Sequence, residues 1–200
     1  MEMGLDWDEA YRSGQYRAHW DYGVASQEVA TCAALGFFRP GCAILDAGCG
    51  SGSDAVFLAG LGYRVTALDV SSAALNLVQE KAAKAGVVVE TVHGSATKMP
   101  IDDASIDVVL DRGLLHNLSD DEGREYAAEL ARVIRPGGGL LVRGARTSYG
   151  GHFNPITTER IHALFPDTYF LKGPVVPLTM ISDAEKDPTL EAAIALIRRK

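Results

Sequence analysis

Short apolar runs alternate with longer amphipathic stretches from about residue 43 onward. Short unbroken apolar runs between turn residues are typical of buried strands, and apolar positions three or four apart are typical of helices. The pattern predicts five strands: "CAILDAG", "YRVTALDV", "VVVETVHG", "SIDVVLDRG" and "GLLVRGA". It predicts three helices between them: "SDAVFLAGLG", "SSAALNLVQEKAAKAG" and "SDDEGREYAAELARVIRPGG". Strands that alternate with helices indicate a parallel, doubly wound α/β sheet.

Start and stop residues support these helices. Ser119 and Glu122 have the spacing of a capping box, and Pro136 followed by Gly137 is expected to end that helix. Residues 1–40 are expected to be mainly helical, with Ser26 as a cap.

The last part of the chain is expected to hold one more helix and two β-prone runs. The helix is "TTERIHALF", and the runs are "TYFLKGPVVPLTMI" and "TLEAAIALIRRK". The final run fits a strand or a short helix. A strand is favoured because the sheet otherwise lacks a closing edge.

Composition narrows the class of protein. Two hundred residues, 47% of them hydrophobic, suit one globular domain, and the net charge of −7 carries no basic stripe for nucleic acid. No apolar stretch reaches membrane-spanning length, so no membrane partner is expected. Three cysteines without paired spacing argue against a disulfide framework or a metal site and favour a reduced, cytoplasmic setting.

The stretch "ILDAGCGSG" carries the chemistry. Asp46 ends the first predicted strand, and Gly48, Gly50 and Gly52 follow at alternate positions. Glycines there let the backbone approach a ligand without an intervening side chain. Loops that bind dinucleotides use G-x-G-x-x-G, but the third position of that spacing is Ser53 here, which argues against a nicotinamide-dependent reductase.

An acid before G-x-G-x-G resembles the first motif of the class I S-adenosylmethionine-dependent methyltransferases. The resemblance covers roughly residues 40–145. It implies a Rossmann-like, mostly parallel seven-stranded sheet with helices on both faces, and S-adenosylmethionine as cofactor with S-adenosylhomocysteine as product. Together with the predicted elements, it divides a single domain into a helical lid segment (1–40), a cofactor-binding core (41–145) and a closing helix with strands (146–200). In the glycine loop it implies cofactor contacts at Asp46, Gly48, Cys49, Gly50 and Gly52.

Two further stretches extend the resemblance. Asp69 ends the second strand, followed by Val70, where a carboxylate can accept both ribose hydroxyls; the alternative is that Asp69 only caps the next helix. "GSATKMP" resembles the family's adenine-binding "G-D-A-x-x-L-P". It departs at Ser95, a neutral and weaker acceptor than aspartate, while Ala96 offers its backbone N–H.

The fourth strand ends in "LDRGLLHNL", which by resemblance lies beneath the methionine part of the cofactor. Asp111 or its backbone is expected to meet the cofactor ammonium; alternatively Asp111 pairs with Arg112 or caps a turn. Arg112, like Arg143, fits either an anionic acceptor or a structural role. His116 is the candidate general base, although a histidine is more often structural than catalytic.

The opening segment is rich in aromatic residues. Trp7, Tyr11, Trp20 and Tyr22 fit a lid that shields a sulfonium cation, simple packing onto the core, or both. Together with "DRGLLH", this segment resembles the small thiopurine and tellurite-resistance type methyltransferases.

Missing motifs point to a small-molecule methyl acceptor. The chain has "DRGL" where enzymes that methylate nucleobase amino groups place "[DNS]-P-P-[YFW]", and it has neither a loop cysteine nor an acidic metal cluster. Methyl transfer is then expected by in-line displacement. The alternative is a non-catalytic module that binds the cofactor. Either a monomer or a homodimer fits the sequence.

Overall fold

The computed structural model describes residues 5–18, 20, 21, 23–181 and 189–200. Its helices are α1 (Trp7–Ser13), α2 (Gln27–Ala34), α3 (Ser53–Gly60), α4 (Ser72–Ala85), α5 (Asp120–Val133) and α6 (Thr158–Leu164), with 3-10 turns η1 (Gln15–Ala18) and η2 (Leu115–Asn117). Its strands are β1 (Ala43–Ala47), β2 (Arg64–Asp69), β3 (Glu90–His93), β4 (Ile106–Arg112), β5 (Ile134–Ala145), β6 (Phe170–Lys172), β7 (Val176–Ile181) and β8 (Thr189–Arg199).

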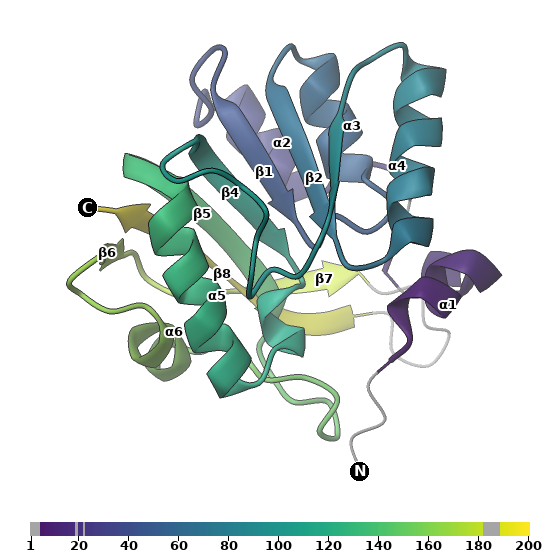
Figure 1. The fold of residues 1–200 in the computed structure, drawn as a ribbon. Helices are drawn as coiled ribbons and strands as arrows, with labels where there is room; N and C mark the ends of the chain where they lie inside the picture. The colour runs from purple at the N-terminus through teal and green to yellow at the C-terminus, as the bar shows by residue number, and fades with distance from the viewer. Residues whose placement is uncertain (1–4, 19, 22, 182–188) are drawn as a thin grey trace.

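The strands form one twisted sheet in the order β3-β2-β1-β4-β5-β8-β6, with β7 also paired to β8 (Figure 1). The five strands from β3 to β5 are parallel, and β8 runs antiparallel to β5, β6 and β7. The predicted doubly wound, mostly parallel α/β sheet is therefore confirmed. It has eight strands instead of seven because "TYFLKGPVVPLTMI" breaks around Gly173 and Pro174 into β6 and β7, which pair with successive parts of β8.

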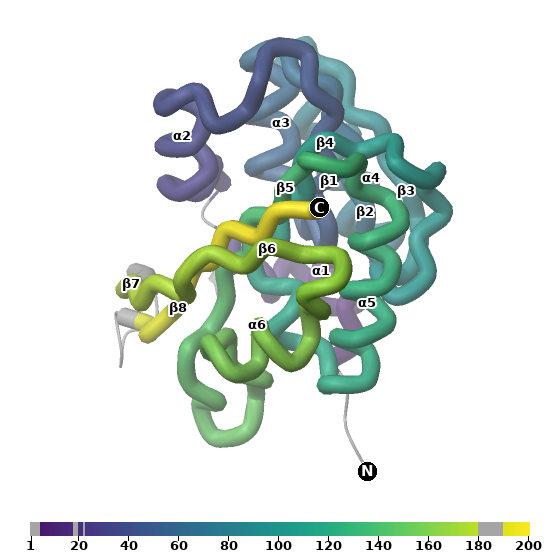
Figure 2. Tube along the Cα trace, turned by 90° about the vertical axis from the view of Figure 1, so that its left-hand side faces the viewer, coloured from purple at the N-terminus to yellow at the C-terminus, as the bar shows by residue number. Residues whose placement is uncertain are grey.

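Helices cover both faces of the sheet. α5 and α6 bury one apolar cluster that includes Leu45, Leu130 and Phe165, and a second cluster with Ile44, Leu58 and Val78 lies beneath α2, α3 and α4. Figure 2 shows α2 and α5 on opposite sides of the sheet. Side chains of each buried strand alternate between the two clusters, as the period of a strand requires.

One predicted boundary was wrong. The helix expected to run up to Pro136 ends at Val133, and Ile134 already has an extended backbone. Ile134 pairs with Ile106 of β4, so β5 begins at Ile134, two residues before Pro136. The capping box of Ser119 and Glu122, the cap at Ser26 and the final strand are confirmed.

The described N-terminal elements are helical, as expected, but His19 and Tyr22 lie outside the described residues. Within the described ranges, no helix has both the length and the apolar character needed to cross a membrane. The three cysteines are free thiols.

Strand register brings the chemistry to one edge of the sheet. Asp46 of β1 is aligned with Ala67 of β2 and Leu110 of β4, so β1, β2 and β4 end at nearly the same level. Asp46, Asp69 and Asp111 therefore come together at the carboxyl edge, where ligands bind in open parallel sheets.

Replacing Leu130 tests the packing of α5 on the sheet. Leu130 is fully buried, so Leu130→Ala should lower the free energy of unfolding by about 2–5 kcal/mol, measured by urea denaturation. The control is Leu35→Ala, because Leu35 is 81% exposed and should cost less than about 0.5 kcal/mol. Equal losses in the two variants would contradict this assignment of the core.

Candidate functional site

The glycine loop between β1 and α3 is built for close approach. Gly48, Gly50 and Gly52 all have positive φ, at 65°, 54° and 76°. A Cβ on Gly52 would lie 2.6 Å from Val78 Cγ2, and one on Gly50 would overlap the Tyr11 hydroxyl. Both backbone strain and lack of space therefore require glycine at these two positions.

The first amides of this loop are used inside the protein. Gly48 and Cys49 N–H donate to the Leu68 carbonyl (2.8 and 3.1 Å), and Gly50 N–H donates to Asp69 Oδ2 (2.9 Å). These bonds tie the loop to the end of β2. These three amides are therefore not available to hydrogen-bond a ligand. What the loop offers a ligand is a backbone surface without side chains.

Asp69 lies at the end of β2 and is 7% exposed. Its Oδ1 accepts the Ser71 N–H (2.9 Å), and its Oδ2 accepts the Gly50 N–H. Burial raises the pKa of Asp69, while these N–H donors act to lower it. The residue that caps α4 is Ser71, whose hydroxyl accepts the Ala74 N–H (3.1 Å), so Asp69 is not the helix cap.

Asp46 is a buried acid with an unused oxygen. It is 3% exposed, and its Oδ2 has no hydrogen-bond partner in the described part of the chain. Burial first, and then the nearby Asp54 carboxylate, raise the pKa of Asp46 to about 8 against the opposing charge of Arg112. A buried acceptor without a donor is costly. The site is therefore prepared for a ligand that brings a donor or a positive charge.

Asp111 caps a turn. Its Oδ1 accepts N–H groups from Gly113, Leu114 and Leu115 at 2.8–3.2 Å, and its side chain does not pair with Arg112. Burial raises the pKa of Asp111 to about 6, although these N–H donors lower it. With the carboxylate fully engaged, only the backbone of Asp111 is left for the predicted contact with a cofactor ammonium.

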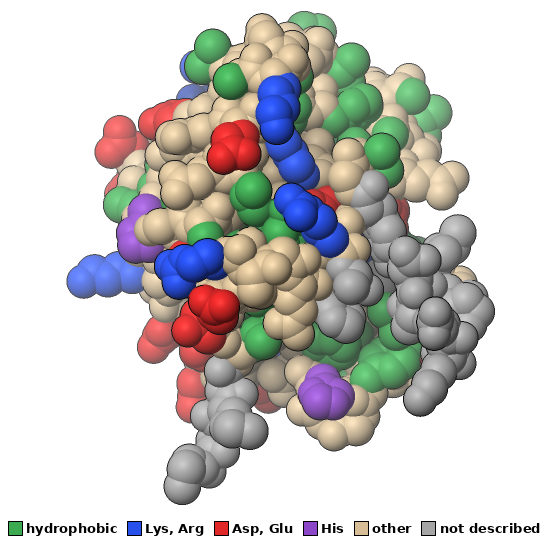
Figure 3. Space-filling view, turned by 90° about the vertical axis from the view of Figure 1, so that its right-hand side faces the viewer, with side chains coloured by type: hydrophobic (Ala, Val, Ile, Leu, Met, Phe, Trp, Pro, Cys, Tyr) green, Lys and Arg blue, Asp and Glu red, His purple; other side chains and the backbone are tan. Residues whose placement is uncertain are grey.

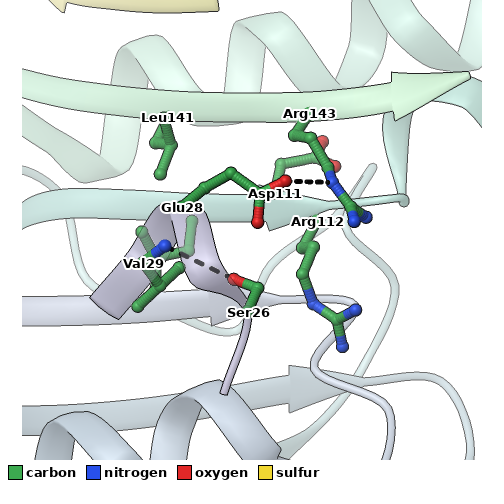
Figure 4. Close-up of a pocket in the computed structure, with 8 residues that line it drawn as sticks. Ser26, Glu28, Val29, Asp111, Arg112, Leu141 and Arg143 are labelled. Carbon is green, nitrogen blue, oxygen red and sulfur yellow. Dashed lines mark hydrogen bonds and ion pairs between the residues drawn. The ribbon is translucent and has the colours of Figure 1, made fainter. Parts of the chain in front are cut away.

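Two arginines lie side by side at the carboxyl ends of β4 and β5 (Figure 4). Arg112 pairs with Asp54 of α3 (2.7 Å), and Arg143 pairs with Glu28 of α2 (3.0 Å). They line a cavity of about 10 Å³, which holds no more than about one water molecule. In this geometry both guanidinium charges are neutralised, which favours a structural role over capture of an anionic acceptor.

His116 lies in η2, just past β4. Its Nδ1 accepts the Ala145 N–H (2.7 Å), and its ring stacks on Phe153 with 4.3 Å between the centroids. Burial, together with the charges of Arg143 and Arg160, lowers the pKa of His116 to about 4. Because the Nδ1 lone pair is engaged and the ring is neutral at pH 7, this geometry favours the structural alternative over a general base.

Of the residues expected around an adenine, Val70 and Ser95 lie near the surface. Val70 is 50% exposed and follows Asp69 directly. The Ser95 hydroxyl lies 3.0 Å from Thr97 Oγ1 and accepts the Thr97 N–H, whereas Ala96 is buried. Ser95 and Val70 therefore offer a polar group and an apolar surface on the side of Asp69 away from β1.

The N-terminal segment covers the glycine loop. Tyr11 is buried, lies over Gly50 and accepts a hydrogen bond from Trp20 Nε1 (3.0 Å). Asp8 accepts the Ala73 N–H and the Ser71 hydroxyl, both at 2.9 Å, at the start of α4. Figure 1 shows α1 beside the lower end of α4.

A polar network fixes the other end of this segment. Lys81 of α4 contacts Asp21 Oδ2 (3.2 Å) and the hydroxyls of Ser51 (2.5 Å) and Ser53 (2.9 Å), and Ser51 also donates to Asp21. Sequence reasoning missed Asp21, Asp54 and Lys81. Only Asp54, an acid in the first turn of α3, left a local signal.

The remaining observations concern charge and metals. On the face in Figure 3, acidic and basic side chains are interspersed. In the part of the chain that the structure describes, no group of three or more His, Cys, Asp or Glu side chains is placed to hold a metal ion. The orphaned Asp46 oxygen and the glycine cradle fit a cationic ligand that carries hydroxyl groups, provided that Tyr11 moves or shares the space.

The family model and curated sequences that this chain matches are described as methyltransferases. Residues 44–138 match the family model described as a methyltransferase domain. The chain is 32% identical over 144 residues to 27-O-demethylrifamycin SV methyltransferase of Amycolatopsis mediterranei (strain S699), an alignment with 68% of this chain and 52% of that protein. It is 39% identical over 137 residues to demethylmenaquinone methyltransferase of Mycobacterium sp. (strain KMS), with 68% of this chain and 55% of that protein. The chain spans about half the length of these curated relatives or less.

Solved structures share the fold. A structure from work on the conversion of a disulfide bond into a thioacetal group during echinomycin biosynthesis aligns with a TM-score of 0.80 and 24% identity, covering 96% of this chain and 91% of that one. The Burkholderia thailandensis 1,6-didemethyltoxoflavin-N1-methyltransferase, with bound 1,6-didemethyltoxoflavin and S-adenosylhomocysteine, aligns with a TM-score of 0.71 and 22% identity, covering 98% and 85%.

The buried state of His116 predicts a pH effect on stability. The folded ring titrates near pH 4, against an ordinary value of 6.5, so between these values protons bind preferentially to the unfolded chain. His116→Asn keeps an acceptor for the Ala145 N–H but cannot titrate. On acidification from pH 7 to pH 5, the wild type should lose about 2 kcal/mol more unfolding free energy than the variant. Parallel stability curves for the two proteins, measured by urea denaturation, would refute the buried neutral imidazole.

Proposed function

We propose that this chain is a class I S-adenosylmethionine-dependent methyltransferase that moves a methyl group from S-adenosylmethionine to a small-molecule acceptor. The observation that carries the proposal is the unpartnered, fully buried Asp46 oxygen beside a glycine loop that admits no side chain. That combination suits a cation with an attached nucleoside.

Seven of the predicted cofactor residues have a role in this proposal. Asp69, held at the end of β2, takes the ribose hydroxyls through the lone pairs left after its two N–H bonds. Val70 and Ser95 contact the adenine, Gly48 and Gly50 leave room for the sugar, and Asp46 with the backbone at Asp111 faces the amino-acid part. The bound cofactor supplies an electrophilic methyl group. The protein then has only to position the acceptor in line and exclude water.

The acceptor would lie above the carboxyl ends of β4 and β5. There the loop after β5 contributes Tyr149 and Phe153, whose rings meet edge to face with 6.2 Å between centroids. The similar proteins named for a rifamycin, a menaquinone or a toxoflavin precursor suggest an acceptor of comparable size. With His116 held as a neutral hydrogen-bond acceptor, the proposal assigns it to positioning this loop.

Residues 1–40 act as a lid in this proposal. Tyr11, which accepts a hydrogen bond from Trp20, covers Gly50. The two attachments of the segment, at Asp8 and Asp21, both fall on helix starts that flank the cofactor site. Entry of the cofactor then requires this segment to shift. Residues 41–145 form the cofactor-binding core, and 146–200 close the sheet.

Two observations favour a second candidate, a non-catalytic module that binds the cofactor. The closed position of Tyr11 over Gly50 and the neutral Ser95 both fit a regulatory domain. Incubation with methyl-labelled S-adenosylmethionine and a metabolite extract distinguishes the two. Labelled product above that of an Asp69→Ala control supports the enzyme, whereas cofactor binding without any transfer supports the module.

Asp69 tests the proposed cofactor site directly. The wild type should bind S-adenosylhomocysteine but not NADH in isothermal titration calorimetry. Asp69→Ala should weaken S-adenosylhomocysteine binding by at least about 100-fold, since a charge-assisted pair of hydrogen bonds is lost. Asp102→Ala, in an exposed loop, is the control. Unchanged affinity in Asp69→Ala, or tight NADH binding, would remove the assignment.

Lys81 tests the lid. Lys81→Met breaks the contacts to Asp21, Ser51 and Ser53, so the segment should open more often and S-adenosylhomocysteine should associate about 3–10-fold faster in stopped-flow fluorescence of Trp7 and Trp20. Lys84→Met, an exposed position on the same helix, should associate at the wild-type rate. A rate unaffected by Lys81→Met would show that the segment does not gate entry.

A further inference from the structure

A second cavity lies at the opposite edge of the sheet, far along the strands from the glycine loop. It has a volume of about 540 Å³, within the range of small-molecule sites. Its walls come from the starts of β4 and β5, the segment after α2, β6 and the end of β8. Figure 2, drawn from this side, places β6 and the C-terminal end of β8 toward the viewer.

The hollow exists because its floor lacks side chains. Three successive residues of β5 are glycines: Gly137, Gly138 and Gly139. Gly139 pairs with Val108 on one side and with Arg198 on the other. A Cβ on Gly138 would lie 2.6 Å from the Asp107 carbonyl, so glycine is required there by packing. A Cβ on Gly139 would meet only Ile197 O at 3.7 Å and Phe37 Cζ at 4.0 Å, so glycine is not required there. An unforced glycine inside a strand often marks close approach by a ligand.

The walls combine apolar side chains with two arginines. Phe37, Leu171 and Leu196 line the cavity and are 36%, 55% and 44% exposed. Arg39 and Arg198 also line it, and neither guanidinium makes a hydrogen bond or ion pair to any part of the chain that the structure describes.

The other charged groups of the cavity are satisfied. Asp107 accepts the Ala43 N–H and pairs with Arg135, both at 2.8 Å, and Lys172 pairs with Asp167 and donates to the Phe165 carbonyl. The charge of Arg39 also acts on the nearby Asp107 and helps to lower its pKa, but Asp107 bonds elsewhere. The cavity therefore carries two guanidinium groups without a hydrogen-bonded partner in the described chain, beside an apolar wall.

We propose that this cavity binds an amphiphilic carboxylate, with Arg39 and Arg198 holding the carboxylate and Phe37, Leu171 and Leu196 receiving the aliphatic chain. Guanidinium groups bind carboxylates through paired, charge-assisted hydrogen bonds. The three exposed apolar side chains lose contact with water when the chain is bound. This site shares no residue with the proposed methyl-transfer site, so the two stand or fall separately.

The probe for this site is sodium decanoate, titrated into the full chain by isothermal titration calorimetry below its micellar concentration. Decanoate should bind at one saturable site, and decyltrimethylammonium, with the same tail and the opposite charge, should not. Replacing both arginines with alanine (Arg39→Ala with Arg198→Ala) should weaken decanoate binding at least about tenfold. Arg124→Ala on α5 is the matched control and should bind as the wild type does.

Gly139→Leu keeps both arginines but fills the floor of the cavity. It should abolish decanoate binding while the thermal unfolding midpoint stays within a few degrees of wild type. Absence of decanoate binding to the wild type, equal binding of the cationic detergent, or unchanged binding in the double arginine variant would each overturn the proposal. Sedimentation velocity provides the last test: a dimer that excludes decanoate and is dissociated by Leu196→Asp would show instead that a second copy of the chain covers this surface.

Discussion

The burial of three carboxylates at one edge of a parallel sheet is the constraint on which this site depends. Parallel strands of nearly equal register place Asp46, Asp69 and Asp111 together, out of water. Two of them are satisfied by backbone N–H groups: Asp111 shapes the turn after β4, and Asp69 holds the glycine loop. Of the three, only Asp46 keeps an oxygen that has no partner among the described residues. Two of the acids thus stabilise the fold itself and one is left for a ligand. Burial and the nearby Asp54 carboxylate raise the pKa of that acid, Asp46, to about 8.

The surroundings of these acids follow from the same need to neutralise buried charge. Arg112 is drawn to Asp54 and lies close enough to Asp46 to lower its pKa, and Lys81 joins Asp21 to the serines of the loop. These links fasten α3, α4 and the N-terminal segment around the loop. Because unpaired buried charges are expensive, removing one partner is expected to disturb the others, and the cover over Gly50 is coupled to the electrostatics beneath it.

The strands and helices of the core could be predicted from the sequence, but the long-range contacts between them could not. The apolar runs located β1, β2 and β4, and the caps located α2, α4 and α5, because these are local properties. Helix α5 ends earlier than predicted because Ile134 pairs with Ile106 of the adjacent strand β4. No local sequence pattern reveals this long-range pairing. The aspartates at the strand ends could be placed by spacing alone. The partners of Arg112 and Lys81 could not, since they depend on contacts between segments distant in the chain.

The most direct test of this account is the pH dependence of S-adenosylhomocysteine affinity, measured by calorimetry in buffers of different ionisation enthalpy. If the ligand's ammonium group pairs with the Asp46 carboxylate, binding must release the proton that Asp46 carries at neutral pH. Wild-type affinity should then rise by up to about tenfold per pH unit between pH 6 and pH 8 and level off above, relative to Asp46→Asn. Identical pH profiles and proton release in the two proteins would mean that the unpaired oxygen of Asp46 is not where the ligand binds.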